Sequence, residues 1–426
     1  MENKISGIFK GDKVIWMVFF FLFIVSMVEV FSSSSTLSYK SEDYWAPAIK
    51  HFQTWCLGII LMILVLNIDC KYFRIATPFL LFISFITLLY VLVAGVSENG
   101  ASRWINLLGF QFQPSELAKS TLVLATAQVL SAMQTENGPE KNTMKFVLIT
   151  SSFLIVPVMF ENLSTAVLMG LIVVLMMFIA KVPYRQLGKI LGVVAVVGVV
   201  AVSGVMLIGS TEEKANDKQN LSEQFERKGE ADDPSLFDKI FHRASTWKGR
   251  IMKFLTSEEV KPEDYDLDTY SQVGHANIAI ASSNIVGKGP GNSVERDFLP
   301  QAFSDFIYAI IIEEIGIWGG ALVALLYIIL LFRTGRIASR CENNFPAFLV
   351  MGLALMMVTQ ALFNMLVAVG LVPVTGQPLP LISKGGSSIV FSCINIGVIL
   401  SVSRSARRKG ETQEVRGEKK VWIILH

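Results

Sequence analysis

Ten apolar segments, each about long enough to cross a bilayer, constrain the fold of this chain more than any other feature. A membrane-spanning helix needs roughly 20 mostly apolar residues, because its backbone polar groups must be satisfied within the segment. Only 17% of the 426 residues are charged, against roughly 25% in soluble domains. The sequence therefore predicts an all-α integral membrane protein whose transmembrane helices lie near 14–36, 52–68, 76–96, 116–132, 144–160, 165–180, 187–209, 303–332, 345–370 and 386–403.

Lysine and arginine residues indicate how these spans are oriented. The segments that share a side with the N-terminus hold 20 lysines and arginines, whereas the short segments on the other side hold 4. Such residues are enriched in cytoplasmic loops. The pattern predicts a single multi-pass membrane domain over 1–426 with both termini in the cytoplasm. The tail 404–426 is basic, and residues 210–302 form a large extracytoplasmic loop between spans seven and eight.

Part of that loop has a helical pattern of its own, near residues 235–255. Its apolar residues recur at helical spacing, and lysines and arginines fill much of the remainder. This arrangement is typical of an amphipathic helix that lies on a membrane surface. The alternative is a helix that packs against the spans.

Composition excludes some classes of function. The formal net charge is +2, with both signs in the loops, so the sequence predicts no nucleic-acid partner. The four cysteines are scattered and have neither disulfide nor metal-ligand spacing.

Polar residues gather on one side of the predicted membrane. A single interfacial charge is most simply an anchor, but these all fall at the outer face and most lie in apolar or glycine-rich stretches. The grouping predicts a site there. Its charged candidates are Arg103, Glu116, Lys119, Lys288, Asp305 and Lys384, and its uncharged candidates are Gln272, Ser383 and Ser387.

Three carboxylates of the eighth span differ in depth. On a continuous helix Glu313 would lie roughly 12 Å deeper than Asp305. Asp305 would occupy the first turn, where the helix dipole favours an ionised carboxylate. The sequence therefore favours Asp305 for chemistry. Glu313 and Glu314 are expected to be structural and to find partners, for example on another span.

Four segments resemble motifs of the SEDS family (shape, elongation, division and sporulation), to which the FtsW and RodA polymerases belong. They are "RWINLLGFQFQPSELAK" (103–119), "AIASSNIVGKGPG" (279–291), "FLPQAFSDFIYAIIIEEIG" (298–316) and "GLVPVTGQPLPLISKGGSS" (370–388). Asp305 is retained. Phe303 and Ser304 stand where the family often has His and Thr, Gln301 replaces a common Glu, and Lys384 replaces a Tyr.

The resemblance implies a peptidoglycan glycosyltransferase that polymerises lipid II, inverting an α-linked donor into a β-1,4 product. Asp305 would be the general base. Arg103 and Lys119, with Lys288 or Lys384, would stabilise the leaving pyrophosphate. The resemblance implies no particular cofactor; a divalent metal, Mg or Mn, could assist and be held by Asp305, but the sequence shows no dedicated ligand cluster.

The resemblance also implies partners and a location. They are the lipid II substrate, a class B penicillin-binding protein, other divisome proteins and the cytoplasmic (inner) membrane at the division septum. The N-terminus and the basic tail look more like the division type than the elongation type, which stays as an alternative. Two other classes stay open: a transporter that flips lipid II or exports another solute, favoured by Glu313 and Glu314, and a scaffold for the division or elongation machinery.

Overall fold

The computed structural model describes residues 10–33, 45–98, 101–107, 110–136, 138–192, 271–299 and 302–424. Internal contacts divide the chain into two units. The larger comprises 1–183, 271–371 and 375–426, and the smaller comprises 184–270 and 372–374. In the smaller unit residues 184–192 are helical. The rest of the predicted span 187–209 and the predicted amphipathic helix near 235–255 lie outside the described residues.

Nine of the ten predicted spans are confirmed as helices in the described part of the larger unit. Seven of the described helices are long and apolar enough to cross a membrane; α6 and α8 are more polar or shorter. The chain is thus a helical multi-pass membrane protein. The nine helices are α2 (Lys13–Ser33), α4 (Ala46–Leu66), α5 (Cys70–Ala94), α6 (Pro114–Ala132), α7 (Thr143–Glu161), α8 (Leu163–Ile179), α13 (Ile307–Ala338), α14 (Asn344–Ala368) and α15 (Gly386–Ile424).

Some helix boundaries differ from the prediction. Helices α4 and α5 each begin six residues earlier than predicted, at Ala46 and Cys70. Their first turns carry lysine, histidine or arginine, which a search for apolar residues leaves out. Helix α15 continues beyond the predicted end at 403 into the basic tail.

Helix α6 lies among other helices rather than against lipid. It packs against α5, α7, α8 and α14, and its buried residues include Glu116 and Lys119. Ionisable side chains are costly in lipid and normally face the interior of a bundle. The polar composition that lowers the hydropathy of α6 is therefore the reason for its central position.

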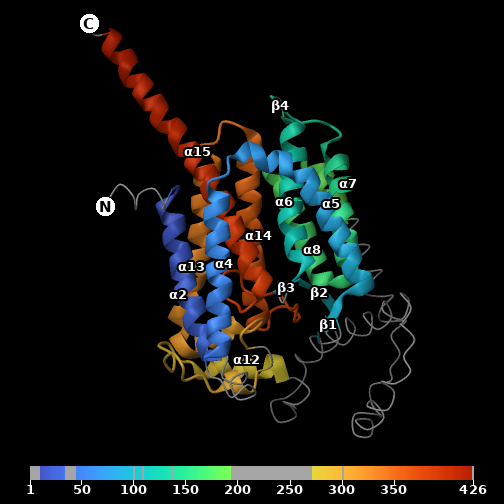
Figure 1. Ribbon diagram of the computed structural model, residues 1–426, viewed down its shortest axis with the longest axis vertical. Helices are drawn as coiled ribbons and strands as arrows, with labels where there is room; N and C mark the ends of the chain where they lie inside the picture. Colours follow the sequence, from blue (N-terminus) through green and yellow to red (C-terminus); the bar gives the residue numbers. More distant parts are fainter. Residues whose placement is uncertain are drawn as a thin grey trace. The chain divides into compact units, whose positions relative to one another are not determined.

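A small antiparallel sheet follows α5, which the sequence analysis did not predict. Strands β1 (Val96–Glu98), β2 (Ala101–Leu107) and β3 (Phe110–Phe112) pair in that order. In the larger unit, these strands and α12 (Ser271–Ser282) lie at the end of the bundle opposite the hairpin of β4 (Gln134–Thr135) and β5 (Gly138–Pro139) (Figure 1). The candidate residues Arg103 on β2 and Gln272 on α12 therefore share one end.

Helix α13 departs from the prediction of one continuous helix over 303–332. It begins at Ile307, after a turn at 302–306, and it has non-helical dihedrals at Gly316 (φ 85°, ψ 179°). The expectation that Asp305 occupies the first helical turn is wrong, because Asp305 precedes the N-cap residue Phe306. The carbonyl groups of Phe303, Ser304 and Asp305 accept hydrogen bonds from other segments.

Candidate functional site

The turn that carries Asp305 is held by the segment between α14 and α15. The Lys384 backbone N–H donates to the Phe303 carbonyl over 2.9 Å. The Ser383 hydroxyl donates to the Ser304 carbonyl over 2.6 Å. The Asn364 amide of α14 donates to the carbonyl of Asp305 itself over 2.8 Å. Three successive carbonyls are thereby fixed, and they set the direction of the Asp305 side chain.

The segment 375–385, here called the clamp loop, is itself anchored to helices α8 and α14, and through Gln360 to α6. Gln360 of α14 donates to the Pro378 carbonyl over 2.9 Å and accepts from Lys119 of α6 over 2.7 Å. Gln377 donates to the Thr165 hydroxyl of α8 over 2.7 Å. These bonds make the clamp loop a rigid support, which is what a catalytic side chain requires.

Asp305 is half-buried and ionisable, and the surrounding backbone approaches it closely. Its Oδ1 accepts a hydrogen bond from the Ser304 hydroxyl over 3.1 Å. A Cβ atom added at Gly376, where φ is +68°, would lie 3.5 Å from Asp305 Oδ2. The clamp loop therefore runs directly beside the carboxylate.

Three buried polar atoms around this site have no hydrogen-bond partner among the described residues. They are Asn364 Oδ1, Thr375 Oγ1 and Ser387 Oγ. Leaving a buried donor or acceptor unpaired costs about 1–3 kcal/mol, so such atoms are informative where they cluster. Asn364 contacts Asp305, Thr375 precedes Gly376, and Ser387 is the second residue of α15. Bound water or polar ligand atoms would satisfy them.

Lys119 is almost fully buried and has two partners. Its Nζ donates to Glu116 Oε1 over 2.9 Å and to Gln360 Oε1 over 2.7 Å, and its side chain is only 2% exposed. An ammonium group has three N–H donors, so one remains beyond these bonds. The Glu116–Lys119 pair thus supports the clamp loop through Gln360, and a phosphate contact by Lys119 stays a prediction.

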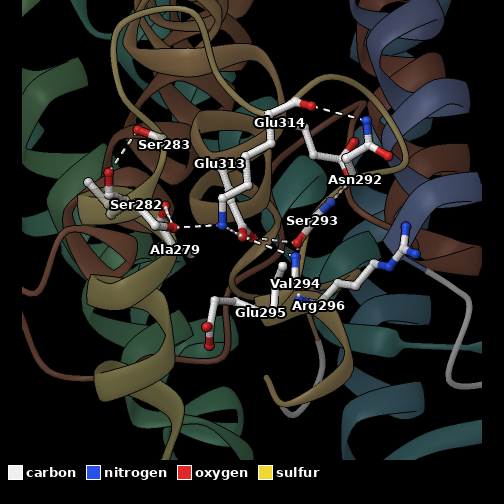
Figure 2. Close-up of polar contacts among 12 residues, drawn as sticks. Ala279, Ser282, Ser283, Asn292, Ser293, Val294, Glu295, Arg296, Glu313 and Glu314 are labelled. Atoms are coloured by element: carbon white, nitrogen blue, oxygen red, sulfur yellow. Dashed lines mark hydrogen bonds and ion pairs between the residues drawn. The ribbon is translucent and has the colours of Figure 1, made fainter.

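A second polar network surrounds Glu313 and Glu314 (Figure 2). Glu313 accepts from Lys288 Nζ over 2.6 Å, from the Val294 N–H and from the Ser293 hydroxyl. Glu314 accepts from the N–H groups of Gly291 and Ser293 and from the Ser32 hydroxyl of α2.

The two glutamates therefore bind the segment that follows α12, and Ser32 of α2 is their one hydrogen-bond partner from another spanning helix among the described residues. Both are fully buried and satisfied within the protein, which suits the predicted structural role. Lys288 is engaged with Glu313 and Ser282, so its contribution to substrate binding also stays a prediction.

Several residues of this site were missed by the sequence analysis. Gln360 and Asn364 are amides four residues apart in an apolar span, which is a readable signal for one polar helix face. Thr375 and Gln377 lie inside the motif at 370–388. Arg103 and Gln272 are half-buried on β2 and α12. In the described ranges no group of three or more His, Cys, Asp or Glu residues could hold a metal.

Known proteins resemble this chain over almost its whole length. The model of a family described as cell cycle protein, that of FtsW, RodA and SpoVE, matches residues 12–226 and 236–408. The probable peptidoglycan glycosyltransferase FtsW of Geobacter sp. (strain M18) is 30% identical over 403 residues, 93% of this chain and 97% of that protein. Stage V sporulation protein E of Bacillus subtilis (strain 168) is 29% identical over 408 residues, with 93% and 98% covered.

A solved structure has the same fold. One chain from a study of polymerisation and crosslinking by a peptidoglycan synthase complex superposes with a TM-score of 0.68. The alignment covers 93% of this chain and 98% of that one, at 22% identity. Similarity at this level of identity establishes a shared arrangement of helices and nothing further.

Proposed function

This chain belongs to the cell cycle protein family of FtsW, RodA and SpoVE, and from that premise we propose that it is a peptidoglycan glycosyltransferase. It polymerises lipid II into glycan strands at the outer face of the cytoplasmic membrane. The observation that carries the proposal is the Asp305 carboxylate, which is half-buried on a turn held by Asn364 and the clamp loop. Three buried polar atoms around it have no partner among the described residues.

The chemistry needs one base and a cationic environment. The 4-hydroxyl of the acceptor attacks the anomeric carbon of the donor, and the bond from that carbon to the pyrophosphate oxygen breaks with inversion. Asp305 takes the hydroxyl proton, and the undecaprenyl pyrophosphate leaves as an anion. Positioned cations stabilise this developing charge; Arg103, Lys119, Lys288 and Lys384 are the candidates. Gln272, Ser383 and Ser387 would supply polar contacts, and a divalent metal at Asp305 is a prediction from the sequence alone.

A polymerisation assay tests the proposal directly. Purified protein in detergent is incubated with labelled lipid II, and glycan strands are resolved by gel electrophoresis. A transporter would instead move lipid II between the leaflets of reconstituted vesicles without lengthening it. Absence of strands together with such transfer would overturn the proposed activity in favour of transport.

Lys119 offers a test of the proposed pyrophosphate contact. Lys119→Ala leaves the Glu116 carboxylate buried without its cation, a loss that costs about 3–5 kcal/mol in other buried pairs. Exchanging the two residues (Glu116→Lys with Lys119→Glu) keeps an ion pair. We expect the exchange to restore folding, measured by thermal melting, but to leave polymerisation at least about 10-fold low, because a charge-assisted hydrogen bond is lost. Full polymerisation by the exchanged protein would make Lys119 purely structural.

We propose that both termini are cytoplasmic and that the site faces outward, on the basis of the asymmetric distribution of lysine and arginine. A reporter fused after residue 230 should then read as extracytoplasmic, and a reporter at the C-terminus should read as cytoplasmic. Activity of an alkaline phosphatase fusion, which requires export, measures the first, and fluorescence of a green fluorescent protein fusion measures the second. The opposite reading at either position would contradict an outward-facing Asp305.

We also propose that a class B penicillin-binding protein crosslinks the strands made by this chain, at the division septum. The similar fold in a peptidoglycan synthase complex supports this proposal, as does the relative named FtsW. Depletion should produce filamentous cells, and a class B protein should co-purify in mild detergent. Round cells would indicate the elongation role instead, and no co-purifying protein of that class would argue against the partnership.

A further inference from the structure

Lys384 carries a half-buried ammonium group that has no anionic partner among the residues that the structure describes. Its Nζ lies 5.0 Å from the centroid of the Phe303 ring, and no described residue accepts a hydrogen bond from it. Burial, and then the charge of Lys50, lower the pKa of Lys384 from its usual value to about 8. A partly desolvated cation beside a like charge is unfavourable unless an anion completes the site.

Lys50 lies on α4, near enough to Lys384 for its charge to lower the pKa of that residue. Its neighbour His51 contacts the Ser26 hydroxyl over 2.8 Å, and that hydroxyl donates to the Ile382 carbonyl over 2.8 Å. The start of α4 is thereby tied to the clamp loop two residues before Lys384. Lys50 itself is exposed, so its ammonium is available to a ligand.

The surroundings of Lys384 also suit an anion. Its backbone N–H binds the Phe303 carbonyl, which places it on the turn that carries Asp305. Helix α15 begins two residues later, and the N–H groups of a first helical turn attract anions. In that first turn the Ser387 hydroxyl is buried without a partner among the described residues.

We propose that Lys384 and Lys50 together form a diphosphate-binding site beside Asp305. This inference rests on the proposed function, because the ligand is the diphosphate of the lipid-linked substrate. The family motif that this segment resembles has tyrosine where this chain has Lys384. A tyrosine would offer one neutral hydroxyl where this protein presents a cation.

Inorganic pyrophosphate is the probe for this site. Its affinity for the purified full-length protein in neutral detergent is measured by titration calorimetry, with thermal melting to verify that each variant is folded. Lys384→Met and Lys50→Gln should each weaken binding about 10-fold, as expected for the loss of one charge-assisted contact. Lys384→Tyr should bind as weakly as Lys384→Met, and it gives a second variant with a side chain that the family accepts.

Lys71 provides a matched control. Its Nζ lies 4.9 Å from the centroid of the Tyr72 ring, a cation–π geometry like that of Lys384, but at the start of α5 rather than beside Asp305. Lys71→Met should leave the affinity for pyrophosphate unchanged. An equal loss of affinity in Lys71→Met would show that only general surface charge is measured, which would overturn the site.

The outcomes separate this inference from the proposed activity. Calorimetry needs no polymerisation, so pyrophosphate binding that depends on Lys384 supports the site even in a protein that makes no glycan. Polymerisation with unchanged pyrophosphate affinity in the variants overturns the site alone. If pyrophosphate does not bind, while nanodiscs that contain phosphatidylglycerol bind in a manner that depends on Lys384 and Lys50, the pair is a membrane anchor and the inference is wrong.

Discussion

Asp305→Asn should reduce the rate of lipid II polymerisation by about 10²–10⁴-fold, the usual contribution of general base catalysis. Asparagine has nearly the same shape and can still accept the hydrogen bond that Ser304 donates to Asp305 Oδ1. It cannot take a proton from the acceptor hydroxyl. The bonds to the backbone carbonyls of the turn are retained, so the variant should fold and bind lipid II normally. Rates with labelled lipid II, corrected for folded protein, measure the effect.

Asp297→Asn is the matched control for this substitution. Asp297 lies in the short helix η3 (Glu295–Asp297) and its side chain is 42% exposed. Replacing the Asp297 carboxylate with an amide should leave the rate of polymerisation unchanged. Glu313→Gln should lower the yield of folded protein, because it weakens a buried ion pair with Lys288, while activity per folded molecule falls much less. A near wild-type rate in Asp305→Asn would place the base elsewhere and require another role for the site.

Gly316→Ala should destabilise the protein by about 2–6 kcal/mol. Its dihedrals, φ 85° and ψ 179°, fall in a region that is essentially restricted to glycine, where other residues cost about 1–3 kcal/mol. An added Cβ would lie 2.3 Å from the Ile285 carbonyl oxygen, and overpacking of this kind costs roughly 1–3 kcal/mol more. Thermal melting and the yield of monodisperse protein after detergent extraction measure the loss.

The reason for this sensitivity is that another segment crosses the helix at Gly316. The N–H groups of Lys288 and Gly289 donate to the carbonyls of Glu313 and Glu314 over 2.9 and 2.8 Å. A shift of the backbone at 285–287 would therefore disturb the network that satisfies both glutamates. The variant should lose stability before it loses any particular step of the chemistry.

Gly335→Ala in the same helix is the control. The nearest atom to an added Cβ there is Met351 Sδ at 3.9 Å, an ordinary contact. Glycine in a helix interior is less stable than alanine by roughly 0.5–1 kcal/mol, so this variant should be equal to or slightly more stable than the wild type. If both alanine variants melted at the wild-type temperature, the break at Gly316 would not be required for folding.

The sequence alone indicates Asp305 and the clamp loop as candidates for the site, but not the residues that support them. Asp305 and the clamp loop stand out because charged and glycine-rich stretches interrupt apolar ones. Gln360 and Asn364 were not predicted, because the sequence can show that the two amides share a helix face but not which groups they contact. Their partners, Pro378 and Asp305, belong to other segments of the chain.

The sequence by itself determined the order and approximate bounds of the nine spanning helices that the structure describes, because a bilayer requires long apolar segments whatever their neighbours are. It also indicated the pairing of Glu116 with Lys119, since three residues along a helix is a fixed distance. The tertiary structure alone decided that α13 breaks at Gly316 and that Asp305 stands before its helix. Both features depend on hydrogen bonds from segments distant in the chain, which compete with the bonds of a regular helix and replace them where packing brings those segments together.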